Sequence, residues 1–188
     1  MTQIFDKEGS AVAVTLVEAG PVEVTQIKNS EKDGYDAIQV GYEKITKKSS
    51  IKKPMKGKEF KTLKEYTGDV IETKTGDIID VSVFNEGDVV KVSGISKGKG
   101  FQGGVKRHGF SGKDRTHGVK HEHRTLGSVG SAYPQRVIKG RKMPGHDGAV
   151  KRTVKNLRVI RIDKDTNILA ISGAIVGRKG TLLEITCE

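Results

Sequence analysis

The stretch HGFSGKDRTHGVKHEHR, residues 108–124, lies in the middle of this 188-residue chain and contains very little that a hydrophobic core could use. Glycine, histidine and cationic residues dominate it, and the flanking sequence continues this pattern from Lys97 to Arg152. The window has neither the apolar period of a strand nor that of a helix. It therefore divides the chain into a segment without a core of its own and flanks that must supply the fold.

The net charge of the protein is concentrated in this window. The whole chain has 34 Lys and Arg against 23 Asp and Glu, a formal charge of +11. Residues 97–152 contain fourteen of the basic residues and three of the acidic ones, a balance of +11, whereas the remaining residues contain twenty of each. The window also contains all five histidines and twelve of the 24 glycines. The electrostatic bias of the protein thus belongs to one internal segment.

Outside the window, apolar and polar residues alternate with a period of two, which predicts β-strands separated by turns rich in Gly, Pro, Asn and Asp. Many short strands at regular spacing favour a closed antiparallel barrel. We therefore predict a mainly β protein, with a closed antiparallel β-barrel body and a long, basic, irregular internal arm. The predicted strands cover residues 11–19, 22–28, 36–43, 78–84, 88–95, 153–163, 166–176 and 181–186.

The predicted body is discontinuous and comprises residues 1–96 and 153–188, with the basic arm at residues 97–152. The body contains an insert at residues 52–66, in which KGKEFKTLKEY (56–66) predicts a short helix. The arm alone cannot bury enough apolar surface to offset its ordering entropy. A loop of this length inside a compact domain is normally functional or disordered, so a polyanionic partner and a solvated, disordered loop are the two interpretations.

A nucleic acid fits the arm best, because Lys and Arg pair with phosphates while glycine lets the backbone approach them closely. RNA is favoured over duplex DNA, since the arm offers no amphipathic helix for a major groove. The predicted RNA-binding residues are the cations and histidines of the arm: Lys97, Lys99, Lys106, Arg107, His108, Lys113, Arg115, His117, Lys120, His121, His123, Arg124, Arg136, Lys139, Arg141, Lys142, His146, Lys151 and Arg152.

Three of these histidines raise an alternative. His117, His121 and His123 have spacings that suit a zinc ion, with Asp114 or Glu122 as a fourth ligand. Four Lys and Arg residues surround them in the sequence and would repel a cation. The sequence therefore predicts no metal site and no cofactor. A metal-dependent enzyme that acts on nucleic acid through this histidine cluster remains the alternative function.

Other functional classes have weaker support. Ser111, His108 and Asp114 are close in sequence, but closeness is not the geometry of a catalytic triad, and GKGFQGG (98–104) lacks the spacing of a nucleotide-binding loop. A single Cys187 allows no internal disulfide. No apolar run is long enough for a membrane span, and the N-terminus has no targeting character. We predict a cytoplasmic protein that is not an enzyme and has no membrane partner.

Aromatic residues of the arm have two possible roles. Phe101, Phe110 and Tyr133 are isolated between polar and glycine positions. Such residues can stack on RNA bases or pin a loop to the protein. The sequence leaves both roles open.

Several motifs in order identify a family. They are GISKGKGFQGGVKRHGF (94–110), THGVKHEHRTLGSVG (116–130), RVIKGRKMPGHDG (136–148) and the hairpin RVIRIDKDTNILAISGAIVGRKGTLLEI (158–185). With them, nearly the whole chain closely resembles the bacterial-type large-subunit ribosomal protein L-three family.

This resemblance implies a structural protein on the ribosome, without catalysis. It implies a β-barrel body at the surface of the large subunit and an arm that threads into large-subunit rRNA of the 23S type, toward the peptidyl transferase region. It also implies an early role in subunit assembly, with neighbouring large-subunit ribosomal proteins as further partners.

Overall fold

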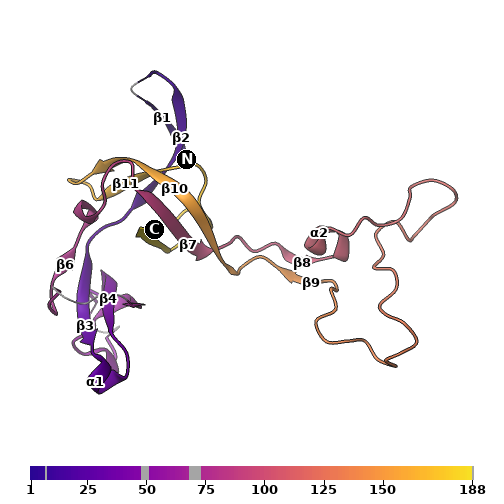
Figure 1. The fold of residues 1–188 in the computed structure, drawn as a ribbon, viewed down its shortest axis with the longest axis horizontal. Helices are drawn as coiled ribbons and strands as arrows, with labels where there is room; N and C mark the ends of the chain where they lie inside the picture. Colours follow the sequence, from indigo (N-terminus) through magenta and orange to yellow (C-terminus); the bar gives the residue numbers. More distant parts are fainter. Residues whose placement is uncertain (7, 48–50, 68–72, 188) are drawn as a thin grey trace. The chain divides into compact units, whose positions relative to one another are not determined.

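The computed structural model describes residues 1–6, 8–47, 51–67 and 73–187 (Figure 1). The chain divides into two compact units. The first comprises Met1–Lys91, Lys155–Ile175 and Thr186–Glu188, and the second comprises Val92–Val154 and Val176–Ile185. The second unit contains the whole predicted arm and, in addition, a segment near the C-terminus. The predicted division into body and arm stays a prediction.

The protein is mainly β, as predicted. The strands are β1 Thr2–Phe5, β2 Ala11–Glu18, β3 Val22–Lys28, β4 Ala37–Lys44, β5 Phe60–Thr67, β6 Ile78–Ile79, β7 Val89–Ile95, β8 Gly100–Gln102, β9 Gly145–Asp147, β10 Lys151–Asp163, β11 Ile168–Ser172 and β12 Leu183–Cys187. The α-helices are α1 Ser30–Asp33 and α2 Gly104–His108, and the 3-10 helices are η2 Lys53–Met55 and η3 Val81–Val83. No helix in the described ranges is long and apolar enough to cross a membrane.

The strands form a six-stranded sheet in the order β1-β2-β11-β10-β7-β12, a four-stranded sheet in the order β5-β4-β3-β6, and the pair β8-β9. Strand β11 pairs antiparallel with both β2 and β10. Within the described residues no sheet closes on itself, so the predicted closed barrel is wrong. Alternation and turn spacing specify where strands form, but closure also depends on strand tilt and stagger, which that pattern does not encode.

The core consists mainly of aliphatic side chains of the strands. In the first unit, Val14 of β2, Val159 of β10, and Leu169 and Ile171 of β11 have at most 1% of their surface exposed. Fully burying one such side chain stabilises the fold by about 1.5 to 3 kcal/mol. Every buried hydrophobic side chain in the described ranges lies outside residues 97–152. The arm was predicted to lack a core, and it contributes nothing to this one.

Residues 56–66 do not form the predicted helix. Their greater part belongs to strand β5, which pairs antiparallel with β4 from Ala37↔Thr67 to Lys44↔Phe60. Phe60 is 7% exposed, and its ring lies directly against Gly41 of β4. The Lys and Glu residues of this segment favour a helix locally, but strand pairing and the burial of Phe60 outweigh that preference.

The predicted strand at residues 78–84 is also too long. Only Ile78–Ile79 pairs, as β6, and the chain then turns into η3. The Asp80 carboxylate caps this turn, since its Oδ1 accepts a hydrogen bond from the Ser82 N–H at 2.8 Å. The apolar alternation of this stretch continues through the turn and therefore does not reveal it.

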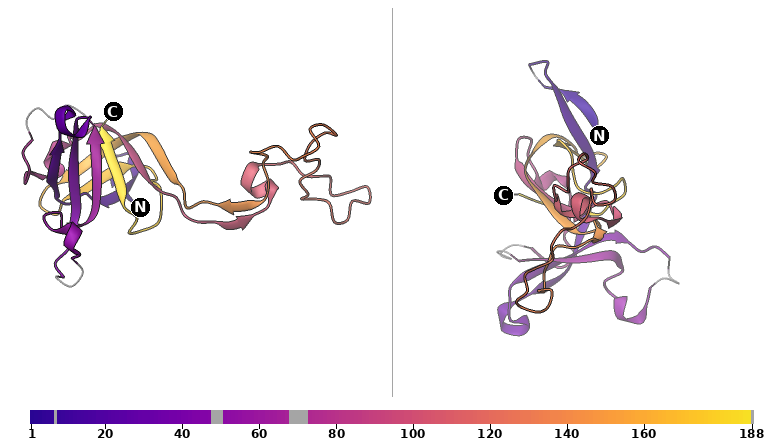
Figure 2. Two further views of the ribbon diagram at one scale, coloured as in Figure 1. Left: turned by 90° about the horizontal axis from the view of Figure 1, so that it is seen from below. Right: turned by 90° about the vertical axis from the view of Figure 1, so that its right-hand side faces the viewer.

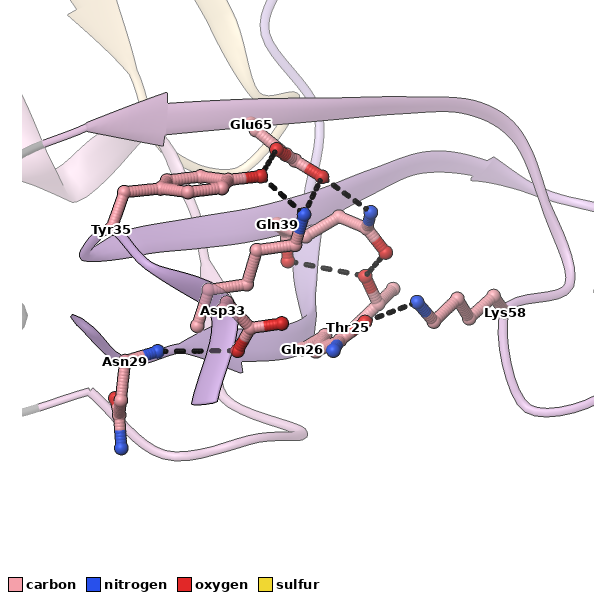
Figure 3. A network of polar contacts seen from close by, with 9 residues as sticks. Thr25, Gln26, Asn29, Asp33, Tyr35, Gln39, Lys58 and Glu65 are labelled. Carbon is pink, nitrogen blue, oxygen red and sulfur yellow. Dashed lines mark hydrogen bonds and ion pairs between the residues drawn. The ribbon is translucent and has the colours of Figure 1, made fainter. Parts of the chain in front are cut away.

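A polar network lies on the four-stranded sheet (Figure 3). The Tyr35 hydroxyl donates to Glu65 Oε2 at 2.9 Å, and Gln39 Nε2 donates to Glu65 Oε1 at 3.1 Å. The Lys28 ammonium forms an ion pair with Glu65 at 2.8 Å. These bonds, with that of Lys28 first, hold the pKa of Glu65 below its ordinary value. The network links β3, β4 and β5 by side chains in addition to their backbone ladder.

Candidate nucleic-acid interface

The arm, residues 97–152, contains three short regular elements. Strands β8 and β9 pair antiparallel, with Gly100↔Asp147 and Gln102↔Gly145 in register (Figure 2). Helix α2 follows β8 directly. Residues 109–144 form no helix or strand. We call residues 97–126 and 143–152 the arm base, and residues 127–142 the arm loop.

Backbone contacts hold the two ends of the arm base together. The Lys99 N–H donates to the Asp147 carbonyl at 2.9 Å. Gly148 has a φ of +77°, and a side chain at this position would collide with the Lys97 carbonyl. Burial opposes ionisation of Asp147, but Lys99 and the Gly148 N–H outweigh it and lower the pKa of that carboxyl. Glycine at position 148 is therefore a condition for the close approach of the two ends.

Helix α2 is fastened to the returning chain through one carbonyl group. Arg107 Nη1 donates to the Met143 carbonyl at 2.7 Å, and His108 Nε2 lies 3.0 Å from the same oxygen. Both residues were predicted to contact RNA. In this structure their ring and guanidinium nitrogens also bind within the arm base, so part of their hydrogen-bonding capacity is already used.

The three aromatic residues separate into two roles. Phe110 is half-buried, and a Cβ placed on Gly104 would lie 3.1 Å from its ring and 3.0 Å from Leu126 Cδ1. Gly104, Phe110 and Leu126 thus pack together, which pins the arm base to itself. Phe101 and Tyr133, in contrast, are 77% and 78% exposed. Those two rings are available for a partner.

The arm loop has few contacts of its own. Every residue from 127 to 142 is exposed. One side-chain hydrogen bond joins residues of the loop that are distant in sequence: Arg141 Nη2 donates to the Ser128 carbonyl at 2.6 Å. The cations Arg136, Lys139 and Lys142 lie in the same exposed segment. The charged side chains of this loop are therefore accessible to a partner.

Most cations of the arm have no carboxylate partner. Lys99 pairs with Asp147 at 3.3 Å, Lys113 pairs with Glu122, and Lys151 pairs with Glu184 at 2.8 Å. The bond from Lys113 also lowers the pKa of Glu122. In the part of the chain that the structure describes, the other eleven make no ion pair: Lys97, Lys106, Arg107, Arg115, Lys120, Arg124, Arg136, Lys139, Arg141, Lys142 and Arg152.

The predicted RNA-binding side chains are accessible. All nineteen residues are exposed except His108 and His123, which are half-buried. His123 Nδ1 lies 3.0 Å from the Asp114 carbonyl, so it joins two segments of the arm base. Surface cations without ion-pair partners, on a backbone rich in glycine, are an arrangement that favours the binding of a polyanion.

The histidine cluster is not assembled into a metal site. Among the described residues, no three His, Cys, Asp or Glu side chains lie close enough to hold a metal ion. His108 is hydrogen-bonded to the Met143 carbonyl, and within the described residues no hydrogen bond joins it to Ser111 or Asp114. The geometry therefore gives no support to the alternative of a metal-dependent enzyme.

Sequence reasoning missed one basic segment. Arg178 and Lys179 belong to residues 176–185, which the structure assigns to the same unit as the arm. Both residues are exposed. Their setting, Gly177-Arg178-Lys179-Gly180, has the alternation of glycine and cations seen in the arm, which was the available signal.

Comparison with known proteins gives a consistent result. Residues 55–176 match the family model described as Ribosomal protein L3. The chain is 45% identical to the large ribosomal subunit protein uL3 of Carboxydothermus hydrogenoformans, over 98% of this chain and 91% of that protein. It is 47% identical to the uL3 protein of Finegoldia magna, over 98% and 92% of the two chains, and 45% identical to the uL3c protein of Guillardia theta, over 98% and 94%.

The β fold, the unpaired cations and these relatives define a structural protein of the large ribosomal subunit, not an enzyme. The chain belongs to the ribosomal protein L3 family, which confirms the resemblance found in the sequence. Its place is therefore on the ribosome.

Proposed function

We propose that the protein binds large-subunit rRNA of the 23S type chiefly through the arm, residues 97–152. In this proposal the arm reaches toward the peptidyl transferase region and the protein supports assembly of the subunit, in the cytoplasm. The observation that carries the proposal is the set of eleven arm cations without ion pairs in the described chain. They lie in a segment whose only buried residues are Gly104 and Gly148.

The residues of the arm have different proposed tasks. The unpaired Lys and Arg side chains neutralise backbone phosphates, and the accessible histidines donate or accept hydrogen bonds to RNA. Phe101 and Tyr133 stack on bases, because their rings are exposed, whereas Phe110 keeps its place in the arm base. Arg107 and His108 hold α2 in position and thereby orient the neighbouring Lys106.

The rest of the chain has another proposed partner. Outside residues 97–152 the charges balance, with twenty basic and twenty acidic residues. A neutral surface gives RNA no general attraction, so we assign neighbouring large-subunit proteins to this part of the molecule.

The test is the salt dependence of binding to large-subunit rRNA. Each neutralised phosphate makes log K fall with log salt by roughly 0.7 to 0.9, so a half-engaged set of arm cations gives a slope on the order of −5 to −10. Replacing residues 97–152 by a short glycine-serine linker is expected to abolish most of the affinity and to leave the β circular-dichroism spectrum. A linker variant that binds rRNA as tightly as the full chain would place the interface elsewhere.

A charge-matched pair of variants locates the interface more finely. One changes Arg136, Lys139, Arg141 and Lys142 of the arm loop to Gln. The other changes four exposed cations outside the arm to Gln: Lys32, Lys53, Lys56 and Lys74. Both remove four charges, but we expect only the first to reduce the salt slope, by about 3. Equal effects of the two variants would mean that net charge alone attracts the RNA.

A further inference from the structure

A hollow lies beside the start of the arm, within the second unit. It is lined by Ile95, Ser96, Lys97 and Gly98 on one side and by Arg178, Gly180 and Thr181 on the other. The two sides are far apart in sequence. We call this set the basic hollow, because its only charged lining residues are Lys97 and Arg178.

The loop that supplies the second side has a defined shape. The Arg178 N–H donates to Thr181 Oγ1 at 3.0 Å, and the Thr181 N–H donates to the Arg178 carbonyl at 3.1 Å. Gly177 has a φ of +95°, and a Cβ there would lie 2.9 Å from the Ile95 carbonyl and 2.7 Å from Thr181 Oγ1. The loop therefore lies directly against the end of β7, and only glycine at position 177 permits it.

The first side is fixed as well. The Ser96 N–H donates to the Val150 carbonyl at 3.0 Å, and Ser96 Oγ accepts the Val150 N–H at 3.3 Å. Ser96 thus ties this side of the basic hollow to the returning chain of the arm base. Both sides are held by bonds that do not involve the charged side chains.

The polar side chains that line the basic hollow can all donate hydrogen bonds. Neither Lys97 nor Arg178 forms an ion pair within the described ranges, and no acidic residue lines the hollow. The Ser96 and Thr181 hydroxyl oxygens both accept backbone N–H groups, which leaves their hydroxyl protons free to donate. Two cations and two hydroxyl donors around one hollow favour an anion with several acceptor oxygens.

We propose that the basic hollow binds one backbone phosphate of the rRNA, with Arg178 and Lys97 as its charged donors. This inference rests on the proposed function and extends the interface to a segment outside residues 97–152. A carboxylate of a neighbouring protein is the other anion that fits. The phosphate is favoured because Lys97 is also the first cation of the arm, so one RNA strand can contact the arm and the hollow in succession.

The experiment compares the full-length variants Arg178→Gln and Lys179→Gln. Both lose one positive charge from the same exposed loop, but Lys179 does not line the hollow. Affinity for large-subunit rRNA is measured at several salt concentrations. We expect Arg178→Gln to weaken binding on the order of tenfold and to reduce the salt slope by about 1, and Lys179→Gln to cause a clearly smaller loss.

A third variant tests the geometry at constant charge. Gly177→Ala displaces the loop from β7, so it is expected to weaken rRNA binding while Arg178 is still present. Thermal unfolding of each variant shows whether the fold is retained. As a readout independent of affinity, photocrosslinking of large subunits that contain the wild-type protein is expected to attach RNA to the peptide containing Thr181.

The outcomes separate the two proposals. If the wild-type protein does not bind rRNA with a steep salt slope, the proposed function fails. If it does, but Arg178→Gln and Lys179→Gln have equal affinities and salt slopes, the basic hollow is not a phosphate site. Crosslinks of the same peptide to a neighbouring protein, and none to RNA, would overturn the inference in favour of a carboxylate.

Discussion

The six-stranded sheet and the arm are kept in place by different interactions. In the sheet, Leu169 and Ile171 of β11 are completely buried, and β11 forms a continuous backbone ladder with β2. The arm base is held by the close backbone approach at Gly148, by the hydrogen bond to the Met143 carbonyl and by the packing of Phe110. The arm loop has almost none of these contacts. The contacts made within the protein thus become fewer from the sheet through the arm base to the arm loop, so we expect a partner to order the arm loop most.

The largest expected effect is on the stability of the sheet. Leu169→Ala removes a fully buried side chain from β11 and is expected to lower the free energy of unfolding by about 2 to 5 kcal/mol, because it leaves a cavity. Phe101→Ala, which truncates a larger but exposed ring, is expected to leave it nearly unchanged. Urea denaturation followed by circular dichroism measures both. A comparable loss in the second variant would show that the arm shares the core of the sheet.

Proteolysis tests the decrease of order within the arm. Trypsin is expected to cut the free protein first after Arg136, Lys139 and Lys142 of the arm loop, at rates on the order of tenfold above those after Lys106 and Arg107 of α2. Mass spectrometry of a time course identifies the sites. Bound rRNA is expected to protect the arm loop. Cleavage in α2 as early as in the arm loop would contradict the distinction between arm base and arm loop.

The aromatic residues give a finer comparison. Phe101→Ala and Tyr133→Ala are each expected to weaken rRNA binding by about 1 to 3 kcal/mol, the usual contribution of stacking on one base, without changing the salt slope. Phe110→Ala is instead expected to speed trypsin cleavage after Lys106, since it removes the packing against Gly104 and Leu126. If the free variant Phe110→Ala is cleaved like the wild type, its ring does not pin the arm base.

The smallest expected effect concerns pH. The hydrogen bond from Lys28 is the largest cause that lowers the pKa of Glu65 in the folded protein. The ionised carboxylate therefore stabilises the four-stranded sheet at pH values above the ordinary Glu pKa of about 4.3. This contribution is lost as the pH falls through the pKa of Glu65 in the folded protein. Wild-type stability is expected to fall more than that of Glu65→Gln between pH 6 and pH 3. The pKa of Glu122 in the arm is lowered too, but Glu122→Gln is expected to leave the urea midpoint of the sheet unchanged.

Local patterns predicted much of the sheet. Each predicted strand overlaps an observed one, because alternation of apolar residues follows from burial of one face. The charge of the arm could also be located, since it depends on composition alone. The open form of the sheet could not be predicted, because closure depends on strand tilt and stagger, which the alternation of apolar residues does not encode. Strand β5 was missed because its Lys and Glu residues favour a helix locally. Its pairing with β4 joins residues that are distant in sequence, so the local pattern does not show it.

The arm base was missed for a different reason. Strands β8 and β9 are each three residues long and far apart in sequence, too short for any period to be visible. Arg107 and His108 looked like free RNA contacts because their shared acceptor, the Met143 carbonyl, is a backbone group that every sequence contains. Arg178 was overlooked because it follows a strongly apolar run. In each case the decisive partner lies more than thirty positions away or on the backbone.

The pairing of β2 with β11 has a consequence for the newly made chain. Leu169 of β11 faces Val17 of β2 in the ladder, and the whole arm lies between these two residues in the sequence. Because translation proceeds from the N-terminus, the fourteen cations of the arm are synthesised before β2 can meet β11. The nascent protein therefore passes through an interval in which the cations of the arm are complete and the sheet is not. Contact with RNA during that interval would begin before the sheet is formed.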